Sequence, residues 1–362
     1  MINIASPILG KKEKDILLEV IDSNIIASGK YVEDFEKKFI AYCGAKFAVA
    51  NANGTAALHT ALLASGIAPA DKVATTPFTF IATANSILYA GAKPVFVDIN
   101  PDTFNIDVQA LEETLKREKN IKAVIVVHLY GLMCDMDAIL ALQKKYKFKL
   151  IEDCAQAHGA EFKGKKAGTF GQAAAFSFYA TKNMTTGEGG MTLLENEKAD
   201  KLARQIINHG RSAHSTFTIV GFNYRLTNLQ AALGIVQLER LEEWTKKRIE
   251  NAKKYDEAFS GFAKVITPKT CENFRHVYHL YTLKIEPKFR TKMLEHLKKN
   301  EIGCGIYYDT VLYKQPVYKK MGYVGGQCPV AEKIVKEVFS IPVGPKLTQE
   351  DTDKIIKTIK NF

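Results

Sequence analysis

One lysine, Lys182, stands between an apolar run and a glycine-rich turn in the segment FSFYATKNMTTGEGGM. Two other polar side chains close apolar runs that are typical of buried strands: Asp153 ends KLIED, and Ser177 lies near the end of AAAFSF. Because ligands of doubly wound sheets bind outside the carboxyl ends of the strands, we expect these three side chains to meet at one edge. A lysine beside a buried carboxylate suits a nucleophile or a structural ion pair equally well, so further residues must decide.

An anion site and an aromatic ring are predicted at the same edge. The segment NANGTAAL places Asn53, Gly54 and Thr55 at the start of a helix, where free N–H groups and the helix dipole attract anions. Phe80 follows the strand-like KVATTP, where its ring either covers a flat ligand or packs into the core. With a lysine and a strand-end carboxylate, these features match the needs of pyridoxal 5'-phosphate (PLP): a Schiff-base lysine, an acidic partner for the pyridinium nitrogen and a phosphate cradle.

The elements that must position these residues alternate between strands and helices over residues 45–210. Short β-branched runs predict buried strands, and segments with apolar residues at i, i+3 and i+4 predict the helices between them. The expected strands are 72–77, 93–99, 122–131, 148–153 and 173–178, and the expected helices are 54–66, 80–91, 107–118 and 135–146. This alternation predicts a parallel sheet with helices on both faces.

A long helix is predicted to lead out of this sheet domain. It starts near Thr227, which forms a capping-box pattern with Gln230 ahead of an apolar stripe. Further along, the expected elements are strands over 276–285 and 304–308, a helix over 290–300 and a helix after Thr348. We therefore expect a large α/β domain over residues 1–245 and a smaller α+β domain over 246–362.

The motifs carry, in order along the chain, a resemblance to a known family. The segments are SGKYVEDFEKKF, NGTAAL, FTFIATANSI, GAKPVFVDI, IEDCAQAHGA, FSFYATKNMTTGEGG, GFNYRLTNLQAALG and SIPVGPKLT. In combination they resemble the DegT/DnrJ/EryC1/StrS nucleotide-sugar aminotransferases over nearly the whole chain. The resemblance implies the PLP-dependent transferase fold of the aspartate-aminotransferase type (fold type I), an α/β fold with a large, mostly parallel, doubly wound sheet domain and a smaller α+β C-terminal domain.

The resemblance implies a role for each motif residue around PLP. Lys182 forms the internal aldimine and later moves the proton between C4' and the sugar carbon. Asp153 keeps the pyridine nitrogen protonated, and Gln156 faces the phenolic oxygen, although Gln156 also suits a helix cap. The other implied cofactor contacts are the phosphate ligands Gly54, Thr55 and Ser177 and the ring-stacking Phe80.

The segment GFNYRL implies a shared active site. In the family, the asparagine that matches Asn223 reaches the phosphate of the neighbouring subunit. Arg225 lies in the same loop and is expected to contact substrate, with an exposed loop arginine as the alternative. A site completed across a two-fold interface predicts a homodimer. The histidine that matches His158 lies near the substrate, where we expect a supporting or structural role rather than acid–base catalysis.

The chain departs from the family in the stretch YYDTVLYKQP. Tyr307, Asp309 and Tyr313 stand where His, Pro and His are common, and Gly344 replaces a common His in IPVGP. Because these positions line the outer pocket in the family, we expect Tyr307 and Tyr313 to contact substrate. An atypical sugar or nucleotide is expected.

The composition argues against several other classes of protein. The net charge of +11 comes from lysines spread over helix faces, so we expect an anionic small substrate and no nucleic acid. The six scattered cysteines form no C-x-x-C pair and no zinc spacing, so we expect reduced thiols and no metal site. Apolar runs fall short of the ~18 residues of a membrane span and no signal-peptide pattern is seen, so we expect a cytoplasmic protein without membrane contact. The segment GAEFKGKK fails as a phosphate loop because Lys166 replaces the Mg-binding Ser or Thr.

The sequence thus predicts transfer of an amino group from L-glutamate to a keto carbon, C3 or C4, of a nucleotide-linked sugar. The product would be an amino sugar for surface glycans or glycosylated metabolites. Two alternatives stay open. A PLP-dependent sugar 3-dehydratase shares the fold but carries His at the Schiff-base position, against which Lys182 argues. A non-catalytic regulatory protein on the same fold would bind PLP without turnover.

Overall fold

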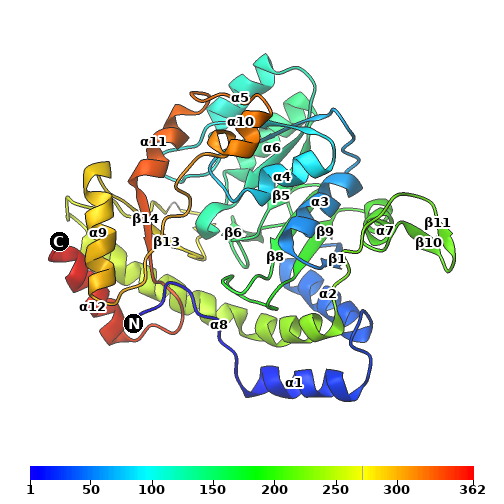
Figure 1. Cartoon of the computed structure of the whole chain (residues 1–362), viewed down its shortest axis with the longest axis horizontal. Helices are drawn as coiled ribbons and strands as arrows, with labels where there is room; N and C mark the ends of the chain where they lie inside the picture. Colours follow the sequence, from blue (N-terminus) through cyan, green and yellow to red (C-terminus); the bar gives the residue numbers. More distant parts are fainter. Residues whose placement is uncertain (271) are drawn as a thin grey trace.

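The computed structural model describes residues 1–270 and 272–362, so one of the six cysteines, Cys271, lies outside the described residues. The other five cysteines are free thiols. Figure 1 shows a central sheet wrapped by helices, with a smaller group of elements at the end of the molecule that holds both termini. Across the described ranges, no helix is both long enough and apolar enough to span a membrane.

A seven-stranded sheet forms the larger part of the molecule. Its order is β1-β9-β8-β5-β4-β2-β3, with bounds β1 (Phe47–Asn51), β2 (Lys72–Thr75), β3 (Lys93–Phe96), β4 (Ile121–Val127), β5 (Lys149–Asp153), β8 (Ala173–Ser177) and β9 (Gly190–Leu194). Neighbours from β3 to β8 pair in parallel, whereas β9 is antiparallel to both β8 and β1. The five predicted strands are confirmed, and β1 and β9 are additional.

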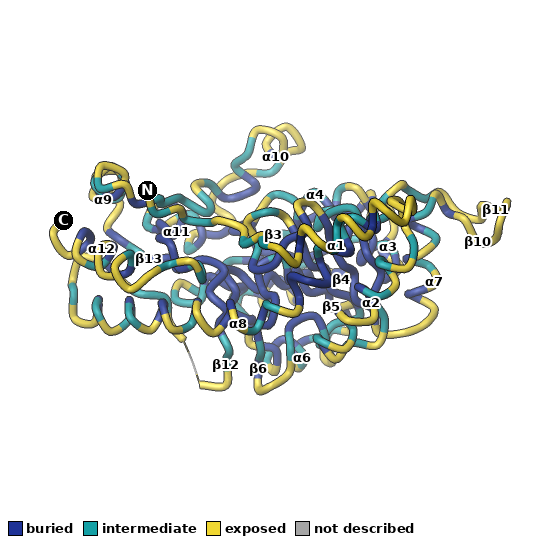
Figure 2. Tube along the Cα trace, turned by 90° about the horizontal axis from the view of Figure 1, so that it is seen from below, coloured by how far each residue is buried: buried dark blue, intermediate teal, exposed yellow. Residues whose placement is uncertain are grey.

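Helices cover both faces of this sheet, as the alternation predicted. One face packs against α2 (Lys30–Cys43), α5 (Val108–Arg117), α6 (Met136–Tyr146) and α8 (Asn228–Phe259). The other face packs against α3 (Gly54–Ala64), α4 (Ala82–Tyr89) and α7 (Glu197–Ile206). Alternate residues of each strand serve the two faces, so that Val124 and Val126 join the first core and Ile125 joins the second. The strands therefore lie in the buried centre of the molecule (Figure 2).

The predicted capping box starts α8, the longest helix. Thr227 Oγ1 accepts a hydrogen bond from the Gln230 N–H, and the Gln230 side chain in turn accepts from the Thr227 N–H. The helix runs for 32 residues and passes through residue 245 without a break. Figure 1 shows α8 continuing from beneath the sheet to the smaller group of elements, with α1 (Lys11–Asp22) alongside it.

The smaller group is built around a separate apolar cluster. It contains α9 (Pro287–Lys299), α12 (Gln349–Lys360) and the antiparallel pair β13 (Tyr281–Lys284) and β14 (Val338–Ile341). The predicted strand over 304–308 is wrong, because this stretch makes a single bridge from Gly305 to Ser340. The beginning of the chain joins this group: the Ile2 N–H donates to Glu301 and the Gly303 N–H donates to Ile2, in parallel pairing.

A third group of apolar side chains joins the C-terminal segment to the sheet. Its rings include Phe78, Phe96 and Tyr130 from the sheet side and Tyr313 and Tyr318 from the C-terminal side. The remaining elements are α10 (Pro316–Lys320), α11 (Pro329–Glu337), the hairpin β10 (Arg211–Ala213) and β11 (Thr216–Phe217), the small sheet β12 (Phe274–Arg275), β6 (Glu161–Phe162) and β7 (Lys165–Lys166), and two 3-10 turns, η1 (Leu129–Gly131) and η2 (Leu312–Lys314).

Candidate active site

Strands β5 and β8 lie side by side, and their carboxyl ends carry Asp153 and Ser177. Asp153 is buried and accepts hydrogen bonds from Thr83 Oγ1 at 2.8 Å and from the Ala155 N–H at 3.1 Å. Burial raises the pKa of this carboxyl even though the hydrogen bonds and the charge of Lys182 act in the opposite direction. A cation placed against Asp153 would therefore be strongly favoured, because it would stabilise the buried negative charge.

Lys182 reaches the same edge from the turn that follows β8. Its backbone N–H donates to the Tyr179 carbonyl at 2.9 Å, which fixes the start of the turn. Burial lowers the pKa of the Lys182 amine to about 8, while the nearby Asp153 carboxylate pulls the pKa upward. The amine is therefore partly neutral near physiological pH, as a nucleophile or a base must be. The glycines of the turn let the chain reverse into β9, with Gly187 at a φ of 81°.

The start of helix α3 forms an anion cradle beside these groups. Asn53 caps the helix by accepting from the Ala56 N–H at 2.9 Å, and its carbonyl accepts from the Ala57 N–H. The N–H groups of the first two helical residues, Gly54 and Thr55, remain for a ligand. A Cβ on Gly54 would lie 2.6 Å from the Ser177 Cβ, so glycine alone allows the helix to approach the end of β8 this closely.

Gln156 links this edge to a tyrosine from the C-terminal segment. Its Oε1 accepts from the Tyr130 N–H at 2.7 Å, and its Nε2 donates to the Tyr308 hydroxyl at 3.2 Å. Burial raises the pKa of Tyr308, and the Asp153 carboxylate adds to this effect, so Tyr308 belongs to the site. Sequence reasoning missed Tyr308. From the sequence, Tyr307 and Tyr313 were selected because each replaces a common His. The only sequence signal for Tyr308 was its place directly after Tyr307.

Phe80 stands at the outer side of the same group. Its ring centroid lies 6.1 Å from that of Tyr308, and the side chain is 56% exposed. This exposure argues against the core-packing alternative for Phe80, since a core ring would be covered. The ring is therefore available to a flat ligand at the strand ends.

The two predicted outer-pocket tyrosines have different surroundings. Tyr307 is half-buried beside Tyr308, with ring centroids 6.4 Å apart. Tyr313 is fully buried in the third apolar cluster, where its hydroxyl donates to Glu332 at 2.8 Å and accepts from the Cys328 N–H at 3.1 Å. The structure therefore brings Tyr307 to the site and does not bring Tyr313 there.

His158 lies in the core, on the side of the sheet that faces α8. Its ring sits 5.4 Å from Phe176 and 5.7 Å from Phe178, measured between centroids. Burial, together with the charges of Lys182 and Arg248, lowers the pKa of His158 to about 3. A permanently neutral, enclosed ring is suited to support the site and not to carry protons for substrate.

Asn223 and Arg225 lie next to the end of β1. Arg225 forms a bridge with Asn51, and its guanidinium donates to Asn208 Oδ1 at 2.7 Å. The Tyr224 carbonyl accepts from the Ala52 N–H at 2.7 Å, which places the loop beside the start of α3. Asn223 is exposed. The loop is thus held by its own chain at the edge of the cradle, with Asn223 directed to solvent-accessible space.

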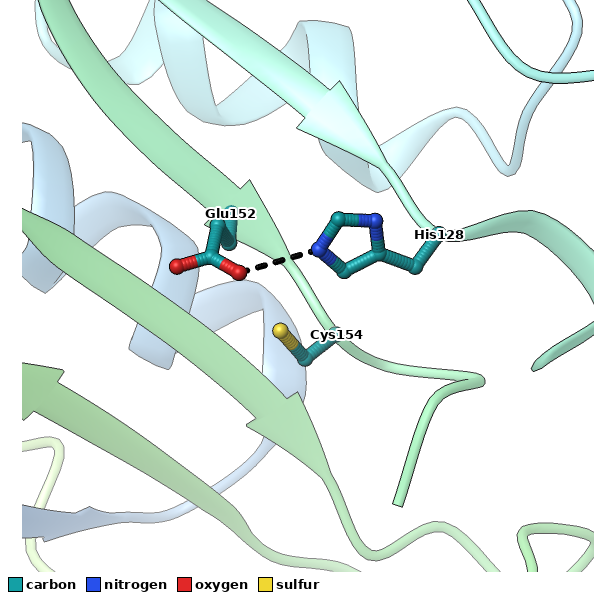
Figure 3. A group of neighbouring side chains, drawn as sticks. All are labelled: His128, Glu152 and Cys154. Carbon is teal, nitrogen blue, oxygen red and sulfur yellow. Dashed lines mark hydrogen bonds and ion pairs between the residues drawn. The ribbon is translucent and has the colours of Figure 1, made fainter. Parts of the chain in front are cut away.

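A second polar cluster, beneath the site, consists of His128, Glu152 and Cys154 (Figure 3). Glu152 accepts from His128 Nε2 at 3.0 Å and also from three backbone N–H groups of the 168–171 loop. His128 Nδ1 accepts from the Cys134 N–H at 3.2 Å. Both ring nitrogens are thus engaged, which leaves no lone pair for a metal. These hydrogen bonds within the chain indicate that the cluster has a structural role.

The residues at the strand ends fit PLP. The cradle of α3 and Ser177 suits a phosphate, and the buried Asp153 carboxylate suits the protonated pyridine nitrogen. The partly neutral amine of Lys182 suits the aldehyde carbon. These groups come from three neighbouring elements of one sheet edge.

Comparison with known proteins agrees with this geometry. Residues 7–360 match the model of the DegT/DnrJ/EryC1/StrS aminotransferase family. A pleiotropic regulatory protein of Geobacillus stearothermophilus is 42% identical over 352 residues, covering 96% of this chain and 93% of that protein. The GDP-perosamine synthase of Caulobacter vibrioides is 38% identical over 363 residues, covering 99% and 97%.

A solved structure shows the same fold with the cofactor. A Streptococcus pneumoniae chain, 26% identical and with a TM-score of 0.93, covers 99% of this chain and 98% of its own length in its PLP form. The same protein has been solved in a form with pyridoxamine 5'-phosphate. This chain therefore belongs to the DegT/DnrJ/EryC1/StrS aminotransferase family of PLP-dependent nucleotide-sugar transaminases.

Proposed function

We propose that this protein moves an amino group from L-glutamate to a keto carbon, C3 or C4, of a nucleotide-linked sugar, producing amino sugars for surface glycans or glycosylated metabolites. One observation carries the proposal: the partly neutral amine of Lys182 stands beside buried Asp153 at an edge with a phosphate cradle. The name of the Caulobacter relative, a GDP-perosamine synthase, supports a nucleotide-linked substrate.

The proposed roles follow from the positions of the side chains. Bound PLP would supply the electron sink for breaking a C–H bond next to nitrogen. Lys182 Nζ would accept the proton from glutamate Cα and later deliver a proton to the sugar carbon. Asp153 would keep its charge against the pyridine nitrogen and so maintain the sink. Glutamate leaves as 2-oxoglutarate, and the keto sugar takes the nitrogen in the second half of the cycle.

The other residues would hold and orient the cofactor. We assign the phosphate to the N–H groups of Gly54 and Thr55 and to the Ser177 hydroxyl, since all three meet at the start of α3. Gln156 would face the phenolic oxygen, and Phe80 would cover the ring. The bond from Gln156 to Tyr308 supports this arrangement because it fixes the amide at the edge of the site.

A coupled assay tests the proposed reaction. Purified protein loaded with PLP is treated with L-glutamate, and the release of 2-oxoglutarate is measured. The aminated protein is then mixed separately with 3-keto and 4-keto sugars carrying UDP, GDP or dTDP, and the products are identified by mass spectrometry. We expect one keto position to be aminated. Release of 2-oxoglutarate with no sugar accepted would contradict the substrate class but leave the transaminase chemistry in place.

The same assay addresses the two alternatives. A sugar 3-dehydratase would release water from the sugar without consuming glutamate. Lys182 argues against this alternative, because the dehydratases carry His at the Schiff-base position. A regulatory protein is suggested by the name of the Geobacillus relative. It would bind PLP and produce no 2-oxoglutarate, so the first half of the assay separates it from a transaminase.

We also propose that two copies of the chain form a dimer with shared active sites. The hairpin β10–β11 projects away from the body of the molecule in both views (Figures 1 and 2), and the loop that carries Asn223 follows it. Large apolar side chains are exposed on this hairpin and its loop, and in the last turn of helix α1 and just after it, as expected for a surface that a partner covers. They are Phe217, Val220, Ile21, Ile25 and Ile26.

Subunit mixing tests the shared site. Lys182→Ala and the double variant Asn223→Ala with Arg225→Ala should each be nearly inactive as homodimers. In a mixed dimer, one site would combine an intact Lys182 with an intact loop, and the other site would collect both defects. Random exchange makes about half of the dimers mixed, so about a quarter of the wild-type activity should return. If tagged co-purification shows exchange and activity stays low, the loop serves its own chain.

A further inference from the structure

The residue that follows Lys182 is anchored by a distant segment of the chain. Asn183 is buried, and its Nδ2 donates to the Val277 carbonyl at 3.3 Å. Its Oδ1 lies 3.2 Å from His279 Nδ1. The bond to Val277 fixes which end of the amide is the oxygen. His279 Nδ1 must therefore carry the hydrogen and donate it, which assigns the tautomer of this ring.

His279 is held in the neutral form by its surroundings. Its side chain is buried, and burial lowers the pKa well below the usual range for histidine. The charges of Lys182 and Arg248 and the neighbouring His158 act in the same direction. The ring therefore stays neutral through the neutral pH range, and the hydrogen bond to Asn183 selects the tautomer that carries its hydrogen on Nδ1.

Arg248, on helix α8, holds the segment that presents His279. Its guanidinium donates to the Tyr278 carbonyl at 3.2 Å and to the His279 carbonyl at 3.4 Å. The side chain is buried, and in the described ranges no carboxylate lies within ion-pair distance of it. The Val277 N–H donates to the Gly131 carbonyl at 3.0 Å, on the side away from α8. The segment is thus fixed from both sides.

We propose that His279 is a positioning residue of the transamination. Through its Nδ1–H bond to Asn183, it fixes the backbone that carries Lys182, and Arg248 fixes the segment that carries His279. This inference rests on the proposed function only in that Lys182 is the reacting amine. Its physical basis is the placement of a reacting group: a shift of about 1 Å in the attacking atom can cost about a hundredfold in rate.

Replacement by asparagine and by leucine tests this role. The amide Nδ2 of asparagine occupies nearly the place of histidine Nδ1 and can donate the same hydrogen bond, whereas leucine fills space and donates nothing. His276→Asn and His276→Leu are the matched controls. His276 is buried in the same segment, but its Nδ1 accepts from the Tyr278 N–H, whereas the side-chain hydrogen bonds of Asn183 go to Val277 and His279.

Two measurements are made on each variant. The first is hydrogen exchange of the peptide that spans residues 178–187 in cofactor-free protein. The second is the glutamate half-reaction of PLP-loaded protein, resolved into a limiting rate constant and an apparent dissociation constant for glutamate. We expect His279→Leu to speed exchange of this peptide and to lower the limiting rate constant about tenfold or more with little change in the dissociation constant. His279→Asn should restore both, and neither control should alter exchange of this peptide.

The outcomes separate this inference from the proposed function. Equal effects of His279→Asn and His279→Leu, or exchange unchanged in both, would overturn the positioning role. Should His279→Leu fail to fold, hydrogen exchange of His279→Asn against His279→Gln decides the question, because glutamine places its amide nearer to the Nε2 position. If wild-type protein releases no 2-oxoglutarate, the proposed function fails, while the exchange result still reports on the link from His279 to Asn183.

Discussion

The inner edge of the site and its outer mouth are built in different ways. At the inner edge, Asp153, Ser177 and Gly54 occupy the ends of elements whose positions are fixed by the buried sheet. At the mouth, Tyr307 and Tyr308 come from an irregular segment held by a hydrogen bond to Gln156 and by aromatic contacts. The inner edge therefore has one arrangement set by β-sheet geometry, whereas the mouth can change residue by residue without disturbing the sheet.

This difference bears on chemistry and selectivity. Residues that would hold PLP lie at the inner edge, where burial alters the pKa of both Asp153 and Lys182. Residues expected to meet the sugar lie at the mouth. We therefore expect substitutions at the inner edge to stop the chemistry and substitutions at the mouth to alter rate or substrate choice.

The largest effect is expected at Lys182. Lys182→Ala removes the nucleophile and base together, so the glutamate half-reaction should fall by about 10⁴-fold. Borohydride reduction of the wild-type protein, followed by peptide mapping, should place PLP on Lys182. An adduct on another lysine would show that the reacting amine does not lie at the inner edge, and the division of roles between the inner edge and the mouth would be wrong.

Asp153→Asn should have the next largest effect. A neutral amide still fills the space and accepts from Thr83, so the cofactor should bind, but it no longer stabilises a protonated pyridine nitrogen. Loss of one preorganised electrostatic partner costs about 10²–10³-fold in rate, and we expect the glutamate half-reaction to fall by this amount. Stopped-flow absorbance measures it. Near-normal turnover would mean that another group polarises the ring.

Gly54→Ala tests whether the anion cradle requires the close approach of helix α3 to the end of β8. The new Cβ would lie 2.6 Å from the Ser177 Cβ, so helix α3 must move away from β8. Overpacking of this kind costs about 1–3 kcal/mol of unfolding free energy, and cofactor affinity should fall with it. Chemical denaturation and a PLP titration measure the two effects. Gly10→Ala is the control, because a Cβ there meets only Glu13 Oε2 at 3.5 Å, an ordinary contact, and its φ of −141° suits alanine.

The pH dependence of cofactor capture should follow the lowered pKa of Lys182. The amine attacks only when neutral, and burial lowers its pKa to about 8. The capture rate should therefore rise as pH increases and level off above the pKa of Lys182 in the folded protein. From pH 7 to pH 9 the neutral fraction increases about tenfold. A rate that still climbs steeply above pH 9.5 would mean an exposed, ordinary lysine.

The smallest effects are expected at the mouth, where two tyrosines should respond differently. Tyr308→Phe loses the bond to Gln156, and we expect the glutamate half-reaction to fall about fivefold, which corresponds to about 1 kcal/mol. Tyr313→Phe should leave turnover unchanged and lower the unfolding free energy by about 1–2 kcal/mol, because it breaks a buried bond to Glu332. A catalytic defect in Tyr313→Phe without loss of stability would show that Tyr313 acts in the active site.

The sequence predicts the inner edge better than the mouth for a physical reason. Strand ends and helix starts carry local signals, so Asp153, Ser177 and the start of α3 could be placed from periodicity and capping. Tyr308 depends on the path of an irregular segment around residues 304–313, where alternation suggested a strand that does not form. Tyr313 was assigned by its place in a motif, and its partner Glu332 is visible only in the folded chain.

The pairing of Ile2 with residues 301–303 has a consequence for biosynthesis. The ribosome releases the segment around Ile2 about 300 residues before its partner exists, a delay of about 15–60 s at ~5–20 residues per second. The sheet can assemble around β1 to β9 during this interval, but the smaller group of elements must wait until residues 301–303 have left the ribosome. Loss of the Ile2 pairing should therefore disturb the smaller group and leave the central sheet intact.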